Sequence, residues 1–241
     1  MPTLTIDKNV QEKIDSWLNG NYDAATKAAI QQLLDKEDHT ALTDAFYKDL
    51  EFGTGGLRGI MGAGSNRVNK YTLGMATQGL CNYLHKTYPK QQIKVAIAHD
   101  NRNNSRLFAK LTAEVFSAND IYVYFFEGLR PTPELSYAIR ELGCQSGVML
   151  TASHNPKEYN GYKAYGEDGG QLVSPADKSV LEEVRKIDNI DKINFNGIEE
   201  NIESIGKEMD DKFLAELVDL SISKEAITRQ SDLKIVFSPI H

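Results

Sequence analysis

The chain has 241 residues, of which 41% are hydrophobic and 25% charged, a composition typical of a soluble globular protein and not of a disordered one. No stretch approaches the ~18 uninterrupted apolar residues that a membrane span needs, so we expect no membrane partner. The net charge of −7, with basic residues scattered along the chain, argues against a nucleic-acid partner.

The N-terminus and the cysteines indicate a cytoplasmic protein. Residues 1–10 contain no apolar run behind a basic region, so they lack the features of a signal peptide. Cys81 and Cys144 have no partners at metal-ligand spacing, which favours buried, reduced thiols. We therefore predict a cytoplasmic location.

Apolar periodicity predicts a helical beginning. Before the first glycine-rich stretch, spaced apolar residues predict two or three short amphipathic helices, and we assign residues 1–40 to a helical N-terminal extension. Asn69 is expected to cap a further helix that ends before Pro89. Residues 93–98 then have the pattern of a buried strand.

The same helix and strand unit recurs. Ser105 is expected to cap a second helix, and residues 121–126 form an apolar, β-rich segment that predicts the next strand. Thr132 is expected to cap a third helix with Pro133 in its first turn, ending near Gly143. Strands therefore alternate with helices along the chain.

The next segment completes the predicted domain. Residues 147–151 and 162–165 are expected to be strands, and residues 174–184 a helix. This order predicts an α/β fold, a three-layer α/β/α domain with a mixed, mostly parallel sheet, over residues 41–190. Ligand-binding loops are expected at the carboxyl ends of its strands.

The last part of the chain has a different character. Residues 188–206 are polar and weakly periodic, which suits a connection between domains. A helix around Phe213 and Leu217 and a strand over residues 233–237 follow. We interpret residues 191–241 as a linker and the truncated start of a second α/β/α domain.

One loop carries the strongest chemical signal. Thr-Ala-Ser-His-Asn-Pro, residues 151–156, directly follows a predicted strand, and Asn-Gly-Tyr-Lys follows at residues 160–163. Such a loop is ordinarily a polar turn. However, a phosphoryl group on Ser153 would carry a charge near −2, and His154 and Lys163 are cations close enough in sequence to neutralise it.

Two further segments are candidates for the same site. Phe-Gly-Thr-Gly-Gly-Leu-Arg-Gly, residues 52–59, has backbone amides that could hold an oxyanion, although glycine-rich turns alone are a weak signal. Asp100 and Arg102 at a strand end are either a structural ion pair or a support for the Ser153 loop. The turn at residues 128–134 is assigned a structural role.

Taken together, these segments resemble the N-terminal part of the α-D-phosphohexomutases, the phosphoglucomutases and phosphomannomutases. The resemblance implies that Ser153 carries a phosphoryl group and passes it to a sugar monophosphate. The reaction would interconvert hexose 1-phosphate and 6-phosphate through a bisphosphate intermediate. The family usually has Ser where this chain has Gly55, and the change is expected to remove one hydroxyl and little else.

The resemblance also implies roles for individual residues. Lys163 is the first choice for general acid/base and His154 the second, with Arg58 beside the phosphoserine. The expected substrate contacts are Thr54, Gly55, Arg58, Asn155 and Lys163, with Asp100 and Arg102 in support. Mg²⁺ would bind the Ser153 phosphate, and hexose 1,6-bisphosphate would be the activator.

Some parts of the family pattern are absent. The Asp-Gly-Asp-Gly-Asp-Arg loop that supplies the metal aspartates does not occur in these residues, and the sugar and distal-phosphate loops are expected beyond His241. We therefore expect the 241-residue chain to be inactive by itself. Its expected partners are a small-molecule sugar phosphate and the remaining domains of the same chain.

Three other interpretations stay open to different degrees. A phosphopentomutase of the same family would share all these motifs, and a non-catalytic sugar-phosphate-binding module would share the fold. A serine hydrolase using Ser153 and His154 is disfavoured, because adjacent residues in an extended loop point apart and no Gly-x-Ser-x-Gly elbow is present.

Overall fold

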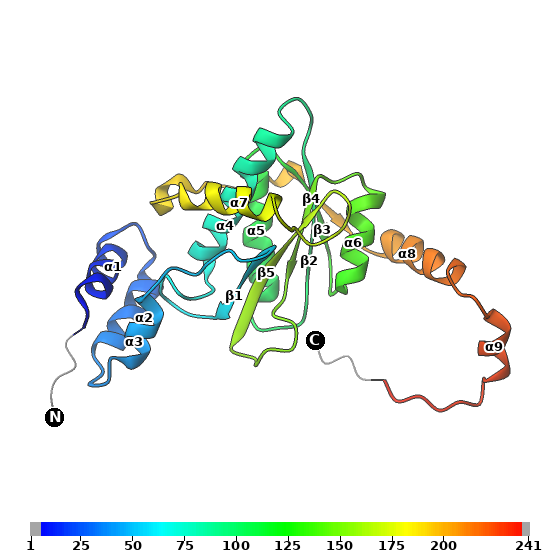
Figure 1. Ribbon diagram of the computed structural model, residues 1–241, viewed down its shortest axis with the longest axis horizontal. Helices are drawn as coiled ribbons and strands as arrows, with labels where there is room; N and C mark the ends of the chain where they lie inside the picture. Colours follow the sequence, from blue (N-terminus) through cyan, green and yellow to red (C-terminus); the bar gives the residue numbers. More distant parts are fainter. Residues whose placement is uncertain (1–5, 238–241) are drawn as a thin grey trace.

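The computed structural model describes residues 6–237. Residues 1–5 and 238–241, the outer ends of the predicted extension and of the predicted second domain, lie outside the described residues. A six-stranded sheet with helices on both faces forms the body of the protein, which confirms the predicted α/β class (Figure 1).

The sheet is mixed, with more parallel than antiparallel pairing. Its strands are β1 (Gly56–Ile60), β2 (Lys94–His99), β3 (Tyr122–Phe126), β4 (Ser146–Leu150), β5 (Tyr159–Gly166) and β6 (Ile202–Ile205), in the order β1-β5-β4-β2-β3-β6. The pairs β4–β2, β2–β3 and β3–β6 are parallel, whereas β5 pairs antiparallel with both β1 and β4. Consequently, the loops after β2, β3 and β4 emerge at one edge of the sheet.

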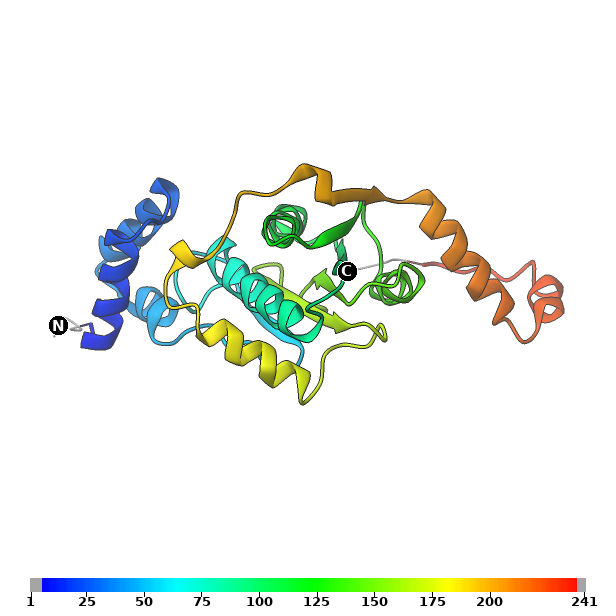
Figure 2. The same ribbon diagram turned by 90° about the horizontal axis from the view of Figure 1, so that it is seen from above.

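Helices cover the sheet in two unequal layers (Figure 2). The helices are α1 (Lys8–Asn19), α2 (Ala24–Leu34), α3 (Thr40–Phe46), α4 (Lys70–Thr87), α5 (Ser105–Ala118), α6 (Thr132–Glu141), α7 (Ala176–Arg185), α8 (Lys207–Asp219) and α9 (Lys224–Arg229). Helices α4, α5 and α7 pack on one face around the largest apolar cluster, and α6 and α8 pack on the other. Alternate residues of β2 point into the two clusters, as a strand buried on both faces requires.

The helical extension has an apolar cluster of its own. Trp17 stacks on Tyr22 with a ring separation of 4.2 Å and meets Phe46 and Tyr71 edge-on at 5.6 and 5.8 Å. Since Tyr71 belongs to α4, the three predicted helices are attached to the sheet domain through aromatic contacts.

A strap of irregular chain, residues 186–201, leads from α7 across α4 and α5 to the far edge of the sheet (Figure 2). Its isoleucines, among them Ile190 and Ile193, complete the apolar cluster of the extension. Asn21 of the extension also donates a 2.8 Å hydrogen bond to Asp191 of the strap. The strap thereby ties the helical extension to the layer of α4 and α5.

The predicted helix starts are right in one case and wrong in two. Asn69 caps α4 by accepting hydrogen bonds from the backbone N–H groups of Tyr71 and Thr72. Ser105 does not cap α5: it is the first helical residue, and Asn104 precedes it with φ of +64°. Thr132 is likewise the first residue of α6, because Pro131 already supplies the extended cap conformation.

Three segments differ from the predicted strands. β1 lies in the stretch expected to be only a glycine-rich loop, and β6 lies within the stretch expected to be a polar connection. Both are edge strands, whose short length and exposed side leave little apolar pattern. Conversely, residues 233–237 form no strand among residues 6–237, since an isolated apolar segment has no ladder to join.

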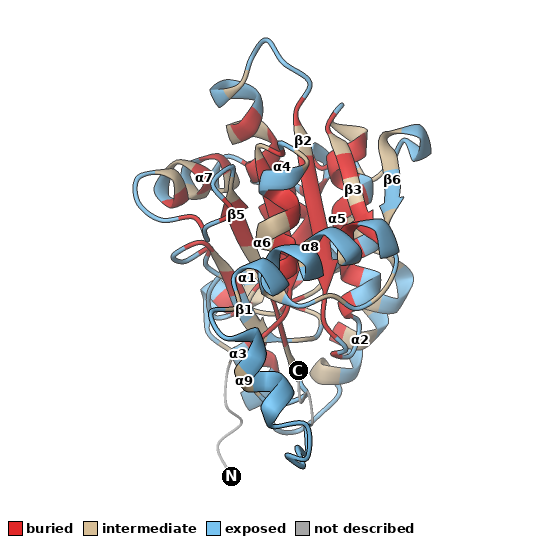
Figure 3. Ribbon diagram, turned by 90° about the vertical axis from the view of Figure 1, so that its right-hand side faces the viewer, coloured by how far each residue is buried: buried red, intermediate tan, exposed pale blue. Residues whose placement is uncertain are grey.

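The end of the described chain is largely uncovered. Leu217, Ile222 and Phe237 are exposed to solvent, whereas the central strands β2 and β4 are buried (Figure 3). Within residues 6–237, no helix combines the length and the hydropathy needed to cross a membrane.

Candidate functional site

A cavity of about 680 Å³ opens at the carboxyl edge of the parallel strands. We call it the Ser153 cavity. Thr151, Ser153 and His154 after β4 and Asp100 after β2 line one part, and Lys163 of β5 lines a second. The loop between β3 and α6, residues 129–133, forms a third part of the wall. This is the edge at which open α/β sheets bind ligands.

Ser153 occupies an unusual backbone conformation at the mouth of this cavity. Its φ is +54°, a left-handed value that a serine rarely adopts and that marks functional sites when the surroundings enforce it. Its N–H donates to the Thr151 hydroxyl at 3.1 Å. Its own hydroxyl lies half-exposed in the cavity, accessible to a ligand.

The turn at Ser153 corrects one expectation from the sequence. Ser153 and His154 were expected to point apart, but Ser153 Oγ lies 3.3 Å from His154 Nδ1. The left-handed φ bends the loop, so the two side chains meet. A hydrolytic triad does not result, because within residues 6–237 no carboxylate is hydrogen-bonded to His154.

Arg102 holds the Ser153 loop from beneath. One guanidinium nitrogen donates to the carbonyl oxygens of Ser153 and Asn155 at 2.5 and 2.7 Å, and the other to those of Pro156 and Tyr159 at 3.0 and 3.3 Å. The Arg102 side chain is only 3% exposed. A planar, buried fork of donors can fix several carbonyls at once, which explains an arginine at this position.

Asp100 and Asn160 complete the support. Asp100 accepts hydrogen bonds from the Arg102 backbone N–H and the Ser105 hydroxyl, and its other oxygen lies 3.4 Å from Arg102 Nε. Asn160, fully buried, donates to the Asn103 carbonyl and to Ser105 Oγ, both at 3.0 Å. No role for Asn160 was predicted from the sequence, although an amide side chain within a predicted strand segment can indicate a polar contact.

Arg58 reaches the site from β1. Its Nη1 donates to Asn155 Oδ1 at 3.0 Å, so the glycine-rich loop and the Ser153 loop meet through side chains. The amides expected to hold an oxyanion are partly used already, because Gly53 and Gly56 donate to each other's carbonyls. Arg58 is therefore the group of this loop that faces the Ser153 loop.

Gly55 is more constrained than the sequence indicates. Its φ is +65°, and a Cβ there would lie 2.5 Å from the Leu172 carbonyl oxygen and 2.7 Å from Gln171 Cγ. The Gln171 amide also donates to the carbonyls of Thr54 and Gly55 at 3.3 Å. The exchange of the usual serine for Gly55 therefore involves backbone conformation and close packing, not one hydroxyl alone.

Lys163 lies on β5 opposite Gly56 of β1 and Met149 of β4. It is half-buried and lines the Ser153 cavity. Among residues 6–237 it has neither a hydrogen-bond acceptor nor an ion-pair partner, so its ammonium group is available to an anion in the cavity.

The predicted site residues thus fall into four groups. Ser153, His154, Lys163 and Asp100 line the cavity, Arg58 and Asn155 bind each other beside it, and Arg102 lies beneath the loop. Thr54 and Gly55 do not line the cavity. Arg130, which the sequence analysis treated as part of a structural turn, brings a second cation to the cavity wall.

The residues present do not make a magnesium site. Within residues 6–237, no three histidine, cysteine or acidic side chains are grouped as metal ligands. Asp100 is the one acidic residue in the described cavity lining, and it is turned toward Arg102 and Ser105. A magnesium ion would need ligands beyond these side chains.

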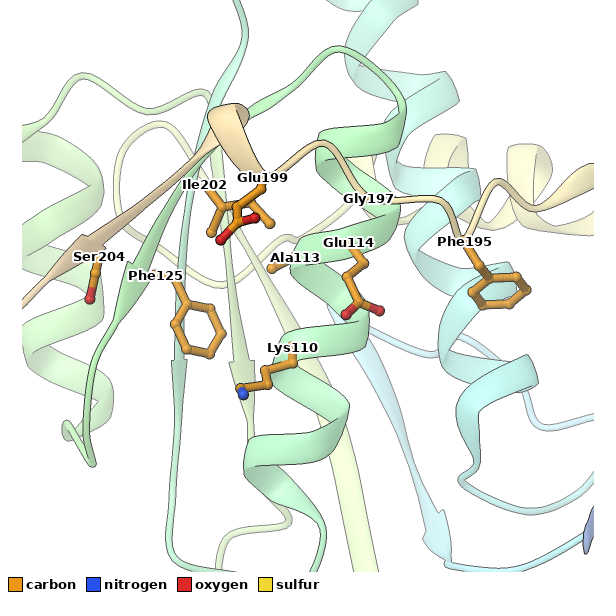
Figure 4. Close-up of a pocket in the computed structure, with 9 residues that line it drawn as sticks. All are labelled: Lys110, Ala113, Glu114, Phe125, Phe195, Gly197, Glu199, Ile202 and Ser204. Atoms are coloured by element: carbon orange, nitrogen blue, oxygen red, sulfur yellow. The ribbon is translucent and has the colours of Figure 1, made fainter.

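A second cavity, of about 540 Å³, has a different character (Figure 4). It lies between α5 and the strap, where Lys110 and Glu114 of α5 face Glu199 of the strap. The two carboxylates outnumber the single lysine in its lining, which disfavours a phosphate ligand. The Ser153 cavity is therefore the better candidate for the site.

Comparison with known proteins gives matches over most of the chain. The family model described as phosphoglucomutase/phosphomannomutase, alpha/beta/alpha domain I, matches residues 49–191. A probable phosphoribomutase of Schizosaccharomyces pombe is 35% identical over 98% of this chain and 41% of its own length. A phosphopentomutase of Mus musculus is 36% identical over 76% of this chain and 31% of its own length. A phosphoglucomutase of Staphylococcus epidermidis is 34% identical, over 92% and 40%.

Solved structures agree on the fold. A putative phosphomannomutase from Thermus thermophilus superposes with a TM-score of 0.51 at 26% identity, covering 66% of this chain and 33% of that protein. The phosphoglucomutase parafusin from Paramecium gives a TM-score of 0.54 at 24% identity, over 69% and 35%. The chain spans between 31% and 41% of the length of these relatives and structures.

Proposed function

The chain belongs to the phosphoglucomutase/phosphomannomutase family, and we propose that it is the part of a phosphosugar mutase that carries the phosphoryl group on Ser153. The observation that carries the proposal is the Ser153 loop itself. A serine with φ of +54°, braced through its carbonyl by Arg102, presents its hydroxyl to a cavity that Lys163 also lines. Maintaining such a conformation costs free energy, which a plain surface turn would not need.

The chemistry follows from charge neutralisation and positioning. In the transfer step the bond between phosphorus and Ser153 Oγ breaks as a bond forms from phosphorus to a sugar hydroxyl. We propose that Lys163 is the general acid/base that exchanges a proton with that hydroxyl, with His154 as the second choice. A proton then returns to Ser153 Oγ, and the reverse steps rephosphorylate the serine from the bisphosphate.

We propose a hexose phosphate as substrate, interconverted between its 1- and 6-phosphates. A pentose phosphate is the second candidate, because the similar proteins named above include a phosphopentomutase and a probable phosphoribomutase as well as a phosphoglucomutase. Arg58, Asn155 and Lys163 are the proposed substrate contacts among the described residues. Thr54 and Gly55 are proposed to act through the shape of the loop that presents Arg58.

We also propose the cofactor, the activator and the cellular location. Magnesium and hexose 1,6-bisphosphate are the expected cofactor and activator, with the metal ligands other than the Ser153 phosphate supplied by further domains. We propose a cytoplasmic location, with a small-molecule sugar phosphate and the remaining domains of the same chain as partners and with no nucleic-acid or membrane partner. We also propose no turnover by the 241-residue chain alone. A non-catalytic sugar-phosphate-binding module would have the same Ser153 cavity without phosphate exchange.

Phosphate mapping tests the proposal directly. The full-length protein that contains this chain is incubated with Mg²⁺ and labelled glucose 1,6-bisphosphate or ribose 1,5-bisphosphate, and peptides are mapped by mass spectrometry. We expect label on Ser153 that is chased onto glucose 1-phosphate faster than onto ribose 1-phosphate. A Ser153→Ala variant is the control. If Ser153 stays unlabelled while the protein still binds the sugar phosphate, the mutase proposal is wrong and the protein is a non-catalytic sugar-phosphate-binding module.

A further inference from the structure

The part of the Ser153 cavity wall formed by residues 129–133 is connected to α8 by an ion pair. Arg130 in this wall forms a bidentate pair with Asp210 of α8, with Nε–Oδ1 and Nη2–Oδ2 distances of 2.5 and 2.7 Å. The Arg130 side chain is 17% exposed and also lies over the Phe126 ring at 5.8 Å. Such planar, two-point pairing fixes orientation as well as distance.

A third charged group is buried beside this pair. Glu134, in the first turn of α6, is 5% exposed, and its Oε1 lies 3.6 Å from Arg130 Nε. That oxygen has no hydrogen-bond partner among residues 6–237. Burial, and then the neighbouring Asp210 carboxylate, raise the pKa of Glu134 to about 7. By contrast, the hydrogen bond from Arg130 lowers the pKa of Asp210.

We propose that Arg130 is a positioning residue of the mutase site, which fixes the 129–133 wall of the Ser153 cavity to α8 through Asp210, and that ionisation of Glu134 loosens this joint. The proposal rests on the proposed function, since it concerns the same cavity. The other contacts between α6 and α8 fix orientation less well. Lys212 of α8 meets Glu141 of α6 at one point, 3.2 Å apart and between exposed side chains, and Tyr137 and Phe213 have ring centroids 5.5 Å apart with tilted planes. The ion pair is therefore the contact that sets the angle of α8 against the wall.

The sign of the pH effect follows from the charges around Glu134. Arg130 is the cation in contact with it, Asp210 of α8 repels its ionised form, and Glu127 and Lys207 lie further out in the same network. A carboxyl whose pKa is raised in the folded state stabilises that state at low pH. Its contribution is complete below its ordinary pKa of 4.5 and is lost as pH rises toward about 7. The ionised carboxylate then competes with Asp210 for Arg130.

Hydrogen exchange of α8 in the full-length protein tests the joint independently of activity. We expect Asp210→Asn to lower the protection of the α8 amides by roughly ten- to hundredfold, the range for losing charge-assisted hydrogen bonds, and to leave the Ser153 loop protected. KM for the sugar phosphate is expected to rise, with Ser153 phosphorylation unchanged. Unchanged α8 protection in Asp210→Asn would overturn the proposal.

A second variant, Glu134→Gln, tests whether ionisation of Glu134 causes the pH dependence. In the unsubstituted protein, α8 protection factors are expected to be higher at about pH 5 than at about pH 8. Glu134→Gln keeps the side chain neutral at both values, so the difference should disappear. A pH dependence that persists in Glu134→Gln contradicts the role of Glu134. If Ser153 proves unphosphorylated, the proposed function fails, but the α8 exchange still decides whether the joint exists.

Discussion

The two loops that meet at the Ser153 cavity are held in place by opposite means. The Ser153 loop is fixed by an added group, the buried Arg102 guanidinium, which binds four backbone carbonyls. The loop that carries Arg58 is held by close backbone packing at two residues without side chains, Gly55 and Gly56. A Cβ at these positions would lie 2.5 and 2.0 Å from carbonyl oxygens. Among residues 6–237, the contact from Arg58 to Asn155 is the one side-chain hydrogen bond that joins the two loops.

This difference shows where each loop is vulnerable. A loop held by a cation loses its shape when the cation is removed, whereas a loop held by close backbone approach loses its shape when a side chain is added. Truncating the Arg102 side chain should therefore disturb the Ser153 loop, and adding a side chain at Gly55 should disturb the loop that carries Arg58. The following substitutions test this contrast, from the largest expected effect to the smallest.

Arg102→Ala should have the largest effect. It leaves Asp100 as a buried, unpaired carboxylate and releases the loop carbonyls, so we expect a loss of about 3–5 kcal/mol in unfolding free energy. Urea denaturation of the full-length protein measures it. Arg102→Lys should restore the charge but not the bidentate geometry, and Ser153 phosphorylation should stay slow.

Arg106→Ala is the matched control, since Arg106 is an exposed arginine in the first turn of α5. Its stability should change by less than about 0.5 kcal/mol. A similar loss in both variants would mean that Arg102 acts through general charge and not through the loop carbonyls.

Gly55→Ser introduces the residue that the family usually carries, yet it should destabilise this chain. The left-handed φ and the crowding by Leu172 and Gln171 together predict a loss of roughly 2–4 kcal/mol. Gly55→Ala should be equally unstable, because the Cβ and not the hydroxyl causes the clash. Thermal unfolding of both variants decides the point, and a stable Gly55→Ser protein would refute the backbone argument.

Gln171→Ala tests the one side chain that supports the glycine loop. Its two hydrogen bonds to the carbonyls of Thr54 and Gly55 are long, at 3.3 Å, so we expect a loss of only about 1 kcal/mol. Gln171→Glu should lose at least as much, since a carboxylate cannot donate to carbonyls. If Gln171→Glu were as stable as the unsubstituted protein in urea, these contacts would contribute nothing.

Asn155→Ala should have the smallest effect on stability. It removes the 3.0 Å contact with the exposed Arg58, and we expect a change within about 0.5 kcal/mol. Because Asn155 is also a proposed substrate contact, KM for the sugar phosphate should still rise. A large loss of stability would show that the two loops support each other structurally, which contradicts the contrast drawn above.

The sequence predicted the long elements well, for a physical reason. Helices such as α4 and central strands such as β2 bury a regular apolar pattern, and Asn69 is a local capping signal. β6 escaped prediction because its four residues, Ile-Glu-Ser-Ile, gain their ladder only from β3, almost 80 residues away. Short edge strands depend on partners that no local pattern encodes.

The site was predictable in its chemistry but not in its geometry. Ser153, His154 and Lys163 were recognisable as a nucleophile with nearby cations. The acceptors of Arg102 were not, because backbone carbonyls have no residue-type signal. The pairing of Arg130 with Asp210, 80 residues apart, likewise depends on how α8 packs against α6.

The strap has a consequence for the order of synthesis. The hydrogen bond between Asn21 and Asp191 joins residues 170 positions apart, and Ile190 and Ile193 cover the aromatic cluster of the extension. At about 5–20 residues per second, a ribosome needs roughly 10–30 s to pass from one partner to the other. Helices α1 to α3 must therefore keep an uncovered apolar surface until nearly all of the sheet has been made.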